Sequence, residues 1–300
     1  MIKLLGWVLF AGLHFGSAPG DTAKLRRDIL AEFAKQPAGI FAVALRDLKT
    51  GETFYMNEHD KFHAASTMKT PVMIETYKQA AAGKFSLDEP VLVHTEFKSI
   101  YDGSLFRVDT VADSEHDLYT KVGTKLPLRD LLYRMITKSS NLATNLVIEI
   151  VDAKKVTATM RSLGANDIEV LRGVEDSAAF NRGMNNMTTA YDLAVIMEHI
   201  ARRNIVSKKA CDEMIKILLD QYFKDIIAAR LPSDVKVASK SGSITAICHD
   251  SGIVFLPDGS KYVVVLLSRG IQDHAVSTET LATVSKIIYD YVISQHSVKK

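Results

Sequence analysis

The sequence contains only two cysteines, Cys211 and Cys248, and its nine histidines are scattered singly. The cysteines are not spaced like metal ligands, and the histidines form no His-x-His or His-Glu-x-x-His cluster, so a zinc site is not expected. We predict that the protein needs no metal and no other cofactor. The two cysteines fit either one disulfide or two buried thiols, and the sequence leaves both alternatives open.

The chain also lacks a strong excess of either charge. Its 300 residues carry a formal net charge of +2, without a long basic run, an internal repeat or a low-complexity tract. Because nucleic-acid-binding proteins usually present a basic patch, we expect no nucleic-acid partner. The length fits one large or two small domains, and we expect a monomer.

The N-terminal apolar stretch, residues 4–15, is too short to cross a bilayer as a helix. It follows Lys3 and precedes a run of small residues, which is typical of a secretory signal peptide. We predict a signal peptide over residues 1–20, and therefore a periplasmic or secreted protein. An uncleaved N-terminal anchor is the alternative. No cysteine follows the apolar stretch, which argues against a lipid anchor.

Apolar periodicity predicts a mixed α/β (α+β) fold. Strands are expected over residues 39–45, 52–56, 235–241, 252–255 and 262–267. Helices are expected over 21–35, 66–82, 128–136, 142–151, 153–163, 189–199, 207–221 and 275–292. This order suggests an antiparallel five-stranded sheet built from both ends of the chain and flanked by the terminal helices. We assign residues 21–61 and 207–300 to this α/β domain, and residues 62–206 to an inserted all-helical domain.

Ser66-Thr67-Met68-Lys69 places a hydroxyl and an amine three positions apart at the expected start of a helix. That spacing puts Ser66 and Lys69 on one helix face, and the helix N-terminus favours developing negative charge. A lysine with a lowered pKa could accept the serine proton. The same spacing recurs at Ser233 and Ser297, so it does not by itself identify a catalytic serine.

Two further short motifs follow, Ser139-Ser140-Asn141 between helical stretches and Lys240-Ser241-Gly242 on an expected strand. Alone, the first is typical of a helix N-cap and the second of an exposed strand end. With Ser66 to Lys69, they resemble the Ser-x-x-Lys, Ser-Asp-Asn and Lys-Thr/Ser-Gly motifs of the class A β-lactamase family of penicillin-recognising serine enzymes. Serine takes the middle place of the second motif. The resemblance spans about residues 21–296 and implies an active site at the interface between the two domains.

The resemblance implies acyl transfer from a β-lactam substrate. Ser66 would attack the carbonyl, Lys69 would accept a proton or tune the site, and Ser139 would pass a proton to the leaving nitrogen. Asn141 would bind the amide side chain of the substrate, and the backbone N–H groups of Ser66 and Ser243 would form the oxyanion hole. The remaining substrate-binding residues would be Lys240, Ser241, Gly242, Ser243 and, at the cleft mouth, Tyr101. A plain loop tyrosine is the alternative for Tyr101.

Residues 172–189 are predicted to form a long ordered loop, and such loops are usually functional. The resemblance implies that Glu175 on this loop activates the water that hydrolyses the acyl-enzyme, with Asp176 as the alternative. The family usually has Leu-Asn three and four positions after this glutamate, and this chain has two alanines there. Asn181, two residues later, could replace that asparagine.

Related D,D-peptidases share the three motifs and act on peptidoglycan stem peptides, so such a peptidase is the second hypothesis. A sensor domain that acylates without turnover is the third, and the complete motif set argues against it. No arginine stands in the strand position that often binds the substrate carboxylate, where this chain has His249 and Asp250. Arg230 and Arg269 are candidate substitutes.

Overall fold

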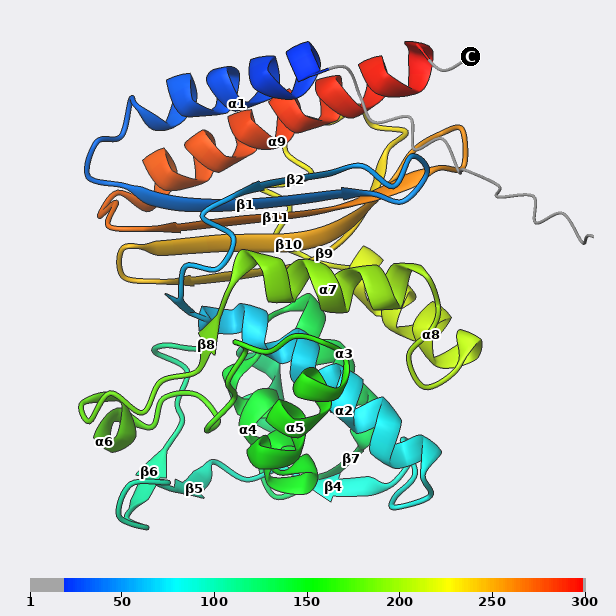
Figure 1. The fold of residues 1–300 in the computed structure, drawn as a ribbon. Helices are drawn as coiled ribbons and strands as arrows, with labels where there is room; N and C mark the ends of the chain where they lie inside the picture. Colours follow the sequence, from blue (N-terminus) through cyan, green and yellow to red (C-terminus); the bar gives the residue numbers. More distant parts are fainter. Residues whose placement is uncertain (1–18, 299–300) are drawn as a thin grey trace, which may run out of the picture.

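The computed structural model describes residues 19–298, and Figure 1 shows their arrangement. The predicted signal peptide falls almost entirely on residues outside this range. Across residues 19–298, no helix combines the length and the apolar composition that a membrane span requires.

A five-stranded antiparallel sheet is the central layer, and it confirms the predicted α+β fold. Its strand order is β2-β1-β11-β10-β9. The strands are β1 (Ile40–Asp47), β2 (Thr53–Met56), β9 (Lys236–Ile244), β10 (Ile247–Phe255) and β11 (Lys261–Arg269). The expected strand at 252–255 is too short, because β10 already begins at Ile247. Only Thr245 and Ala246 join β9 to β10. Ala246 adopts a left-handed φ of 57°, a conformation that glycine or asparagine would predict but alanine does not.

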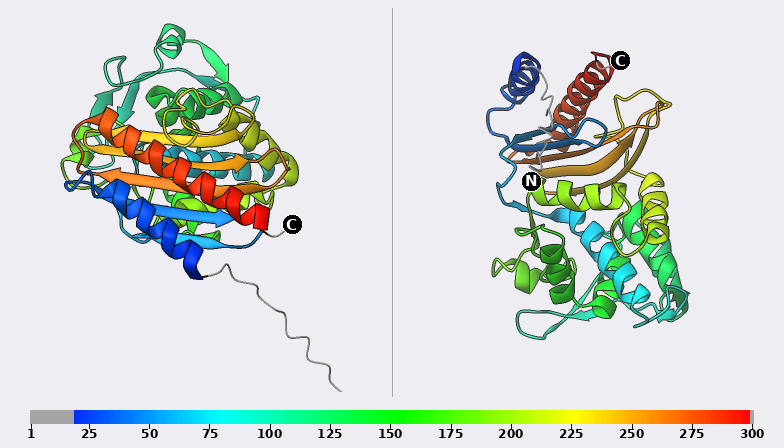
Figure 2. Two further views of the ribbon diagram at one scale, coloured as in Figure 1. Left: turned by 90° about the horizontal axis from the view of Figure 1, so that it is seen from above. Right: turned by 45° about the vertical axis from the view of Figure 1, so that its right-hand side comes forward.

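Both faces of the sheet are covered, as the continuous apolar run in β11 requires. Alternate residues of β11 point to opposite sides, so Val263 and Val265 pack in one core and Val264 and Leu266 in the other. The terminal helices α1 (Pro19–Phe33) and α9 (His274–Val298) lie side by side on one face (Figure 2). Phe33 of α1 stacks on Phe41 of β1 with ring centroids 4.0 Å apart.

The helical layer lies under the opposite face (Figure 1). It contains the 3₁₀ turn η1 (Ala65–Met68) followed by α2 (Lys69–Ala81), α3 (Leu128–Thr137), α4 (Asn141–Val151), α5 (Ala153–Ser162), α7 (Ala190–Ala201) and α8 (Lys208–Leu219). Helix α7 packs against β1, β10 and β11, while α8 touches both β9 and α3. The expected domain boundary at residue 207 therefore falls just before a helix that contacts both layers.

Short elements complete the chain. Small two-stranded ribbons pair β3 (Phe62–His63) with β8 (Met187–Thr188), β4 (Pro90–Leu92) with β7 (Lys125–Pro127), and β5 (Glu96–Lys98) with β6 (Leu105–Arg107). The remaining short helices are η2 (Asp117–Lys121) and α6 (Ser177–Phe180). The long loop expected over 172–189 thus contains α6 and β8. The β3–β8 pairing ties the end of this loop to the strand that leads into Ser66.

Candidate active site

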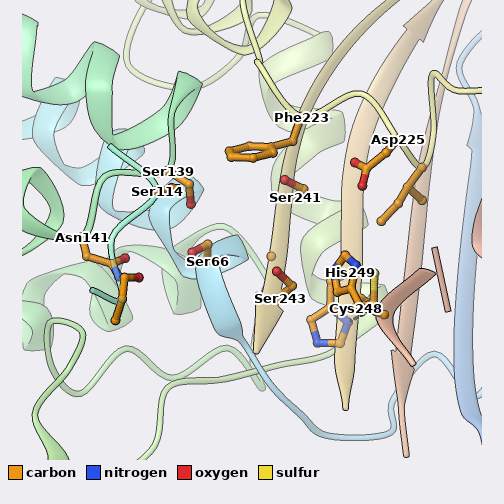
Figure 3. Close-up of a pocket in the computed structure, with 14 residues that line it drawn as sticks. Ser66, Ser114, Ser139, Asn141, Phe223, Asp225, Ser241, Ser243, Cys248 and His249 are labelled. Carbon is orange, nitrogen blue, oxygen red and sulfur yellow. Dashed lines mark hydrogen bonds between the residues drawn. The ribbon is translucent and has the colours of Figure 1, made fainter. Parts of the chain in front are cut away.

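The three motifs converge where η1 meets strand β9 (Figure 3). Ser66 is the second residue of η1, so its N–H group belongs to those that a helix start leaves without an intrahelical partner. Gly242 of β9 packs directly against this turn. A Cβ at position 242 would lie 2.8 Å from the backbone nitrogens of Ser66 and Thr67. Only glycine therefore lets the strand approach Ser66 so closely.

Lys69 is fully buried at the first position of α2, three residues after Ser66 in sequence. Its Nζ contacts Ser139 O at 2.5 Å, Ser139 Oγ at 3.2 Å and Asn141 Oδ1 at 3.0 Å. Burial lowers the pKa of Lys69 to about 7, although the nearby carboxylates of Asp113 and Glu175 act in the opposite direction. A substantial neutral fraction near pH 7 makes this amine a suitable proton acceptor.

The Ser139 hydroxyl lies between two buried amines. Its Oγ is 3.2 Å from Lys69 Nζ and 3.1 Å from Lys240 Nζ, and Lys240 also donates to Ser241 O at 2.7 Å. Burial and the neighbouring Lys69 hold the pKa of Lys240 well below its usual value. A proton on Ser139 can therefore be exchanged with either amine and relayed into the cleft.

The Asn141 side chain links the first motif to the long loop. Its Oδ1 accepts from Lys69, and its Nδ2 donates to Glu175 Oε1 at 2.7 Å and to Ala112 O at 3.1 Å. Glu175 is half-buried, and desolvation raises the pKa of its carboxyl group. A carboxylate with a raised pKa is a stronger base than one in water.

Three of the residues around Ser66 have a strained backbone. Ala65, Ser139 and Glu175 adopt positive φ angles of 46°, 56° and 64°. Left-handed φ is unfavourable for residues other than glycine, and such strain is concentrated at functional sites. Each of these residues is next to, or carries, a group that we assign to the chemistry.

Asp176, the alternative base, has another task. Its buried carboxylate accepts from Ser99 Oγ at 2.8 Å and Ile100 N at 3.0 Å, and it caps α6 through Ala179 N. These bonds fasten the 99–104 loop to the Glu175 loop. Asn181 is exposed at the end of α6 and lines neither cavity described below. The structure therefore does not bring it beside Glu175.

The cleft consists of two adjoining cavities of about 250 and 260 Å³ that share Ser66 and Asn141. The first extends along β9 past Ser139, Ser241 and Ser243, as Figure 3 shows. The second leads to Glu175. The sequence did not point to several residues that line the first cavity: Ser114, Phe223, Asp225, Cys248 and His274. They come from loops and element ends, where periodicity carries no information.

Several expected residues lie elsewhere. Tyr101 is 43% exposed and stacks with Arg182, outside the residues that line the two cavities. Arg230 pairs with Glu279, and Arg269 binds Lys61 O, so neither reaches the cleft. His249, in contrast, does line the first cavity (Figure 3), but it is fully buried and burial lowers its pKa to about 4, so it is uncharged near neutral pH.

The cysteines are two buried free thiols rather than a disulfide. Cys211 belongs to the core around the helical layer, and Cys248 to the core on the opposite face of the sheet. Among residues 19–298, no group of three histidine, cysteine or carboxylate side chains is arranged to hold a metal ion.

Known structures share this architecture. A beta-lactamase from Sphaerobacter thermophilus superposes with a TM-score of 0.77 and 25% identity, covering 90% of this chain and 96% of the other. The structure of PBP-A has a TM-score of 0.79 and 23% identity, covering 90% and 96%, which shows the fold alone. The fold is thus that of beta-lactamases and PBP-A.

The chain belongs to the beta-lactamase enzyme family, which matches residues 24–292 and makes the protein a hydrolase. Among characterised relatives, the extended-spectrum beta-lactamase PER-1 of Pseudomonas aeruginosa is 22% identical over 268 residues. That match covers 82% of this chain and 80% of PER-1.

Proposed function

We propose that the protein is a serine β-lactamase of the class A type that hydrolyses penicillins and cephalosporins through an acyl-Ser66 intermediate. The main support is the Asn141 side chain, which bonds Lys69 Nζ on one side and Glu175 Oε1 on the other. The Asn141 amide therefore links Lys69, the candidate base for acylation, to Glu175, the candidate base for deacylation, close to Ser66. Membership of the beta-lactamase enzyme family supports the same conclusion.

In acylation, Ser66 Oγ attacks the β-lactam carbonyl while Lys69 takes its proton. The backbone N–H groups of Ser66 and Ser243 stabilise the oxyanion, and the close packing of Gly242 sets the distance between them. Ser139 then delivers a proton to the departing nitrogen, because its hydroxyl is within 3.2 Å of both lysine amines. Ring opening leaves the acyl group on Ser66.

In deacylation, Glu175 removes a proton from a water molecule that attacks the ester. The carboxylate lines the cavity that Ser66 also lines, and its raised pKa suits this role. The ring-nitrogen side of the opened substrate points into the other cavity, where Ser241 and Ser243 bind its carboxylate. Lys240 is fully buried and lines neither cavity, and its amine orients Ser139 beside the substrate. We further propose that the protein is exported and acts as a monomer on this small molecule, without a cofactor or nucleic acid.

A D,D-peptidase that acts on peptidoglycan stem peptides is the second candidate. It is favoured by the likeness to PBP-A, a mutant of which was solved as an acyl-enzyme complex with penicillin G. It is also favoured by the two alanines, Ala178 and Ala179, that stand where the resemblance predicts Leu-Asn. Under this alternative, Ser66 would be acylated but hydrolysis would be slow.

Turnover of a chromogenic cephalosporin, followed by colour and by intact mass, tests the proposal. We expect many turnovers per molecule for residues 21–300 and none for Ser66→Ala. A parallel incubation with an N-acylated D-Ala-D-Ala peptide should release no D-alanine. Release of D-alanine together with a stoichiometric, long-lived cephalosporin adduct would establish the peptidase instead.

A further inference from the structure

Residues 109–117 form a segment that we call the strap, which lies against the Ser139–Asn141 turn. Ser114 Oγ donates to Lys138 O at 2.6 Å, and Ala112 O accepts from Asn141 Nδ2. Glu115 is buried and binds Arg134 of α3 at 2.6 Å. The strap is therefore fastened to both sides of the second motif. It lies in a polar stretch in which the sequence shows no periodicity.

Asp113 is the buried centre of the strap, with 4% of its surface exposed. Its Oδ2 accepts from the backbone nitrogens of Asn141 and Leu142, each at 2.9 Å, and from Tyr119 Oη at 3.0 Å. These two N–H groups belong to the first turn of α4, where a negative charge is favoured. Ser140 Oγ lies 3.4 Å from the same oxygen. One carboxylate thus fixes the backbone that carries Asn141.

We propose that Asp113 is a positioning residue for the reaction, supplying from the strap the carboxylate that orients the Ser139–Asn141 turn toward Lys69 and Glu175. Ser140 makes this arrangement possible, because an aspartate at position 140 would place a second carboxylate against Asp113 Oδ2, and the two negative charges would repel each other. This inference rests on the proposed function, since orientation of Asn141 matters only if Lys69 and Glu175 react.

The charge of Asp113 also acts on both bases. It raises the pKa of Lys69 and that of Glu175. The ionisable groups that face this pair from the packed elements are Asp109, Asp113, Tyr119 and Lys240. Removing the carboxylate should therefore lower both pKa values and move the acid limb of the rate profile to lower pH. A loss of stability alone would not move that limb.

The position of Ser140 offers a specific test, because an aspartate there would bring its carboxylate close to the present place of Asp113 Oδ2. We expect Asp113→Ser to lower the turnover rate of a chromogenic cephalosporin by at least about tenfold, as a loosened catalytic turn should. Ser140→Asp alone should also lower it, since two carboxylates would then share one site. The double variant should recover to within about threefold of the unmutated enzyme, because coupled neighbours are not additive.

The unfolding temperature provides a second reading of the same cycle that requires no reaction. Both single variants should unfold at lower temperature and the double variant should recover. Asp117→Asn, at the η2 end of the strap but exposed and paired with Arg134, is the control and should leave the rate profile unchanged. Asp113→Asn keeps the shape and should show the acid-limb shift.

Additive losses in the double variant, in both rate and unfolding temperature, would overturn the proposal. An Asp113→Asn profile with an unmoved acid limb would overturn it as well. If the unmutated protein showed neither turnover nor an adduct, the proposed function would fail, and recovery of the unfolding temperature would then decide whether the two carboxylates are interchangeable in holding the turn.

Discussion

Replacing Gly242 by alanine tests how closely the sheet must approach Ser66, the proposed nucleophile. The added Cβ would lie 2.8 Å from the backbone nitrogens of Ser66 and Thr67, whereas ordinary contact begins at 3.4 Å. Strand β9 or η1 must therefore retreat by about 0.6 Å, which separates the two N–H groups assigned to the oxyanion hole. Because a shift of this order misaligns reacting groups, we expect acylation to slow by about 10²-fold.

The matched control for this variant is Gly252→Ala, in β10 of the same sheet. There the new Cβ would lie 2.9 Å from Ser239 Cβ and 3.2 Å from Ala238 O, a comparable clash away from Ser66. Both variants should lose similar stability in thermal unfolding. Only Gly242→Ala should show a slow acylation phase in stopped-flow measurements with a chromogenic cephalosporin. Equal acylation rates in the two variants would refute the assignment of the oxyanion hole.

Three further predictions concern single side chains. The burst rate of acylation should rise as pH increases through about 7, because the pKa of Lys69 is lowered to about 7 and its neutral form is the base; a burst that is flat across this range would contradict this role. Asp176→Asn should lower the free energy of unfolding by about 1–3 kcal/mol through weakened bonds to buried partners, while turnover persists; lost turnover with unchanged stability would make Asp176 the base. Intact mass should show Cys211 and Cys248 reduced, and thiol reagents should label them fully only after unfolding, since both are buried; a mass lower by two hydrogens would indicate a disulfide.

The sequence predicted secondary structure well where the residue pattern strongly favours one kind of element. The apolar run in 262–267 follows a turn signal and is rich in valine, which favours a strand buried on both faces, and this strand lies at the centre of the sheet. The order of the terminal elements likewise predicted the shared sheet. The start of β10 was missed, because a Thr-Ala turn carries none of the usual glycine, asparagine or aspartate signals.

The candidate site likewise contains residues that the sequence predicted and one that it did not. Lys69, Ser139, Asn141 and Lys240 were expected together from their motifs. In the fold, the Lys69 amine bonds Ser139 Oγ and Asn141 Oδ1, and the Lys240 amine bonds Ser139 Oγ. The role of Asp113 was not visible, because its partners lie about thirty residues away and only the fold brings them together. The one available signal was Ser140, the serine in the middle place of the second motif, where the family has an aspartate.

The cleft walls were the least predictable part. Phe223 and Asp225 line the first cavity from the segment after α8, and His274 lines it from the start of α9. None of these residues belongs to a periodic pattern or a motif. Their positions in the cleft depend on loop conformation, which the sequence pattern does not predict. Tyr101 shows the opposite case, in which a plausible residue type pairs with Arg182 instead of lining the cleft.

The central claim is that Ser66 is acylated and that Glu175 frees it again. Rapid quenching followed by intact mass measurement, on the unmutated enzyme and Glu175→Gln with the same cephalosporin, tests this directly. We predict a transient adduct that disappears with continued turnover in the unmutated enzyme, and one persistent equivalent in Glu175→Gln that is absent when Ser66→Ala is added. Unchanged turnover in Glu175→Gln, or an adduct that survives the loss of Ser66, would contradict the account.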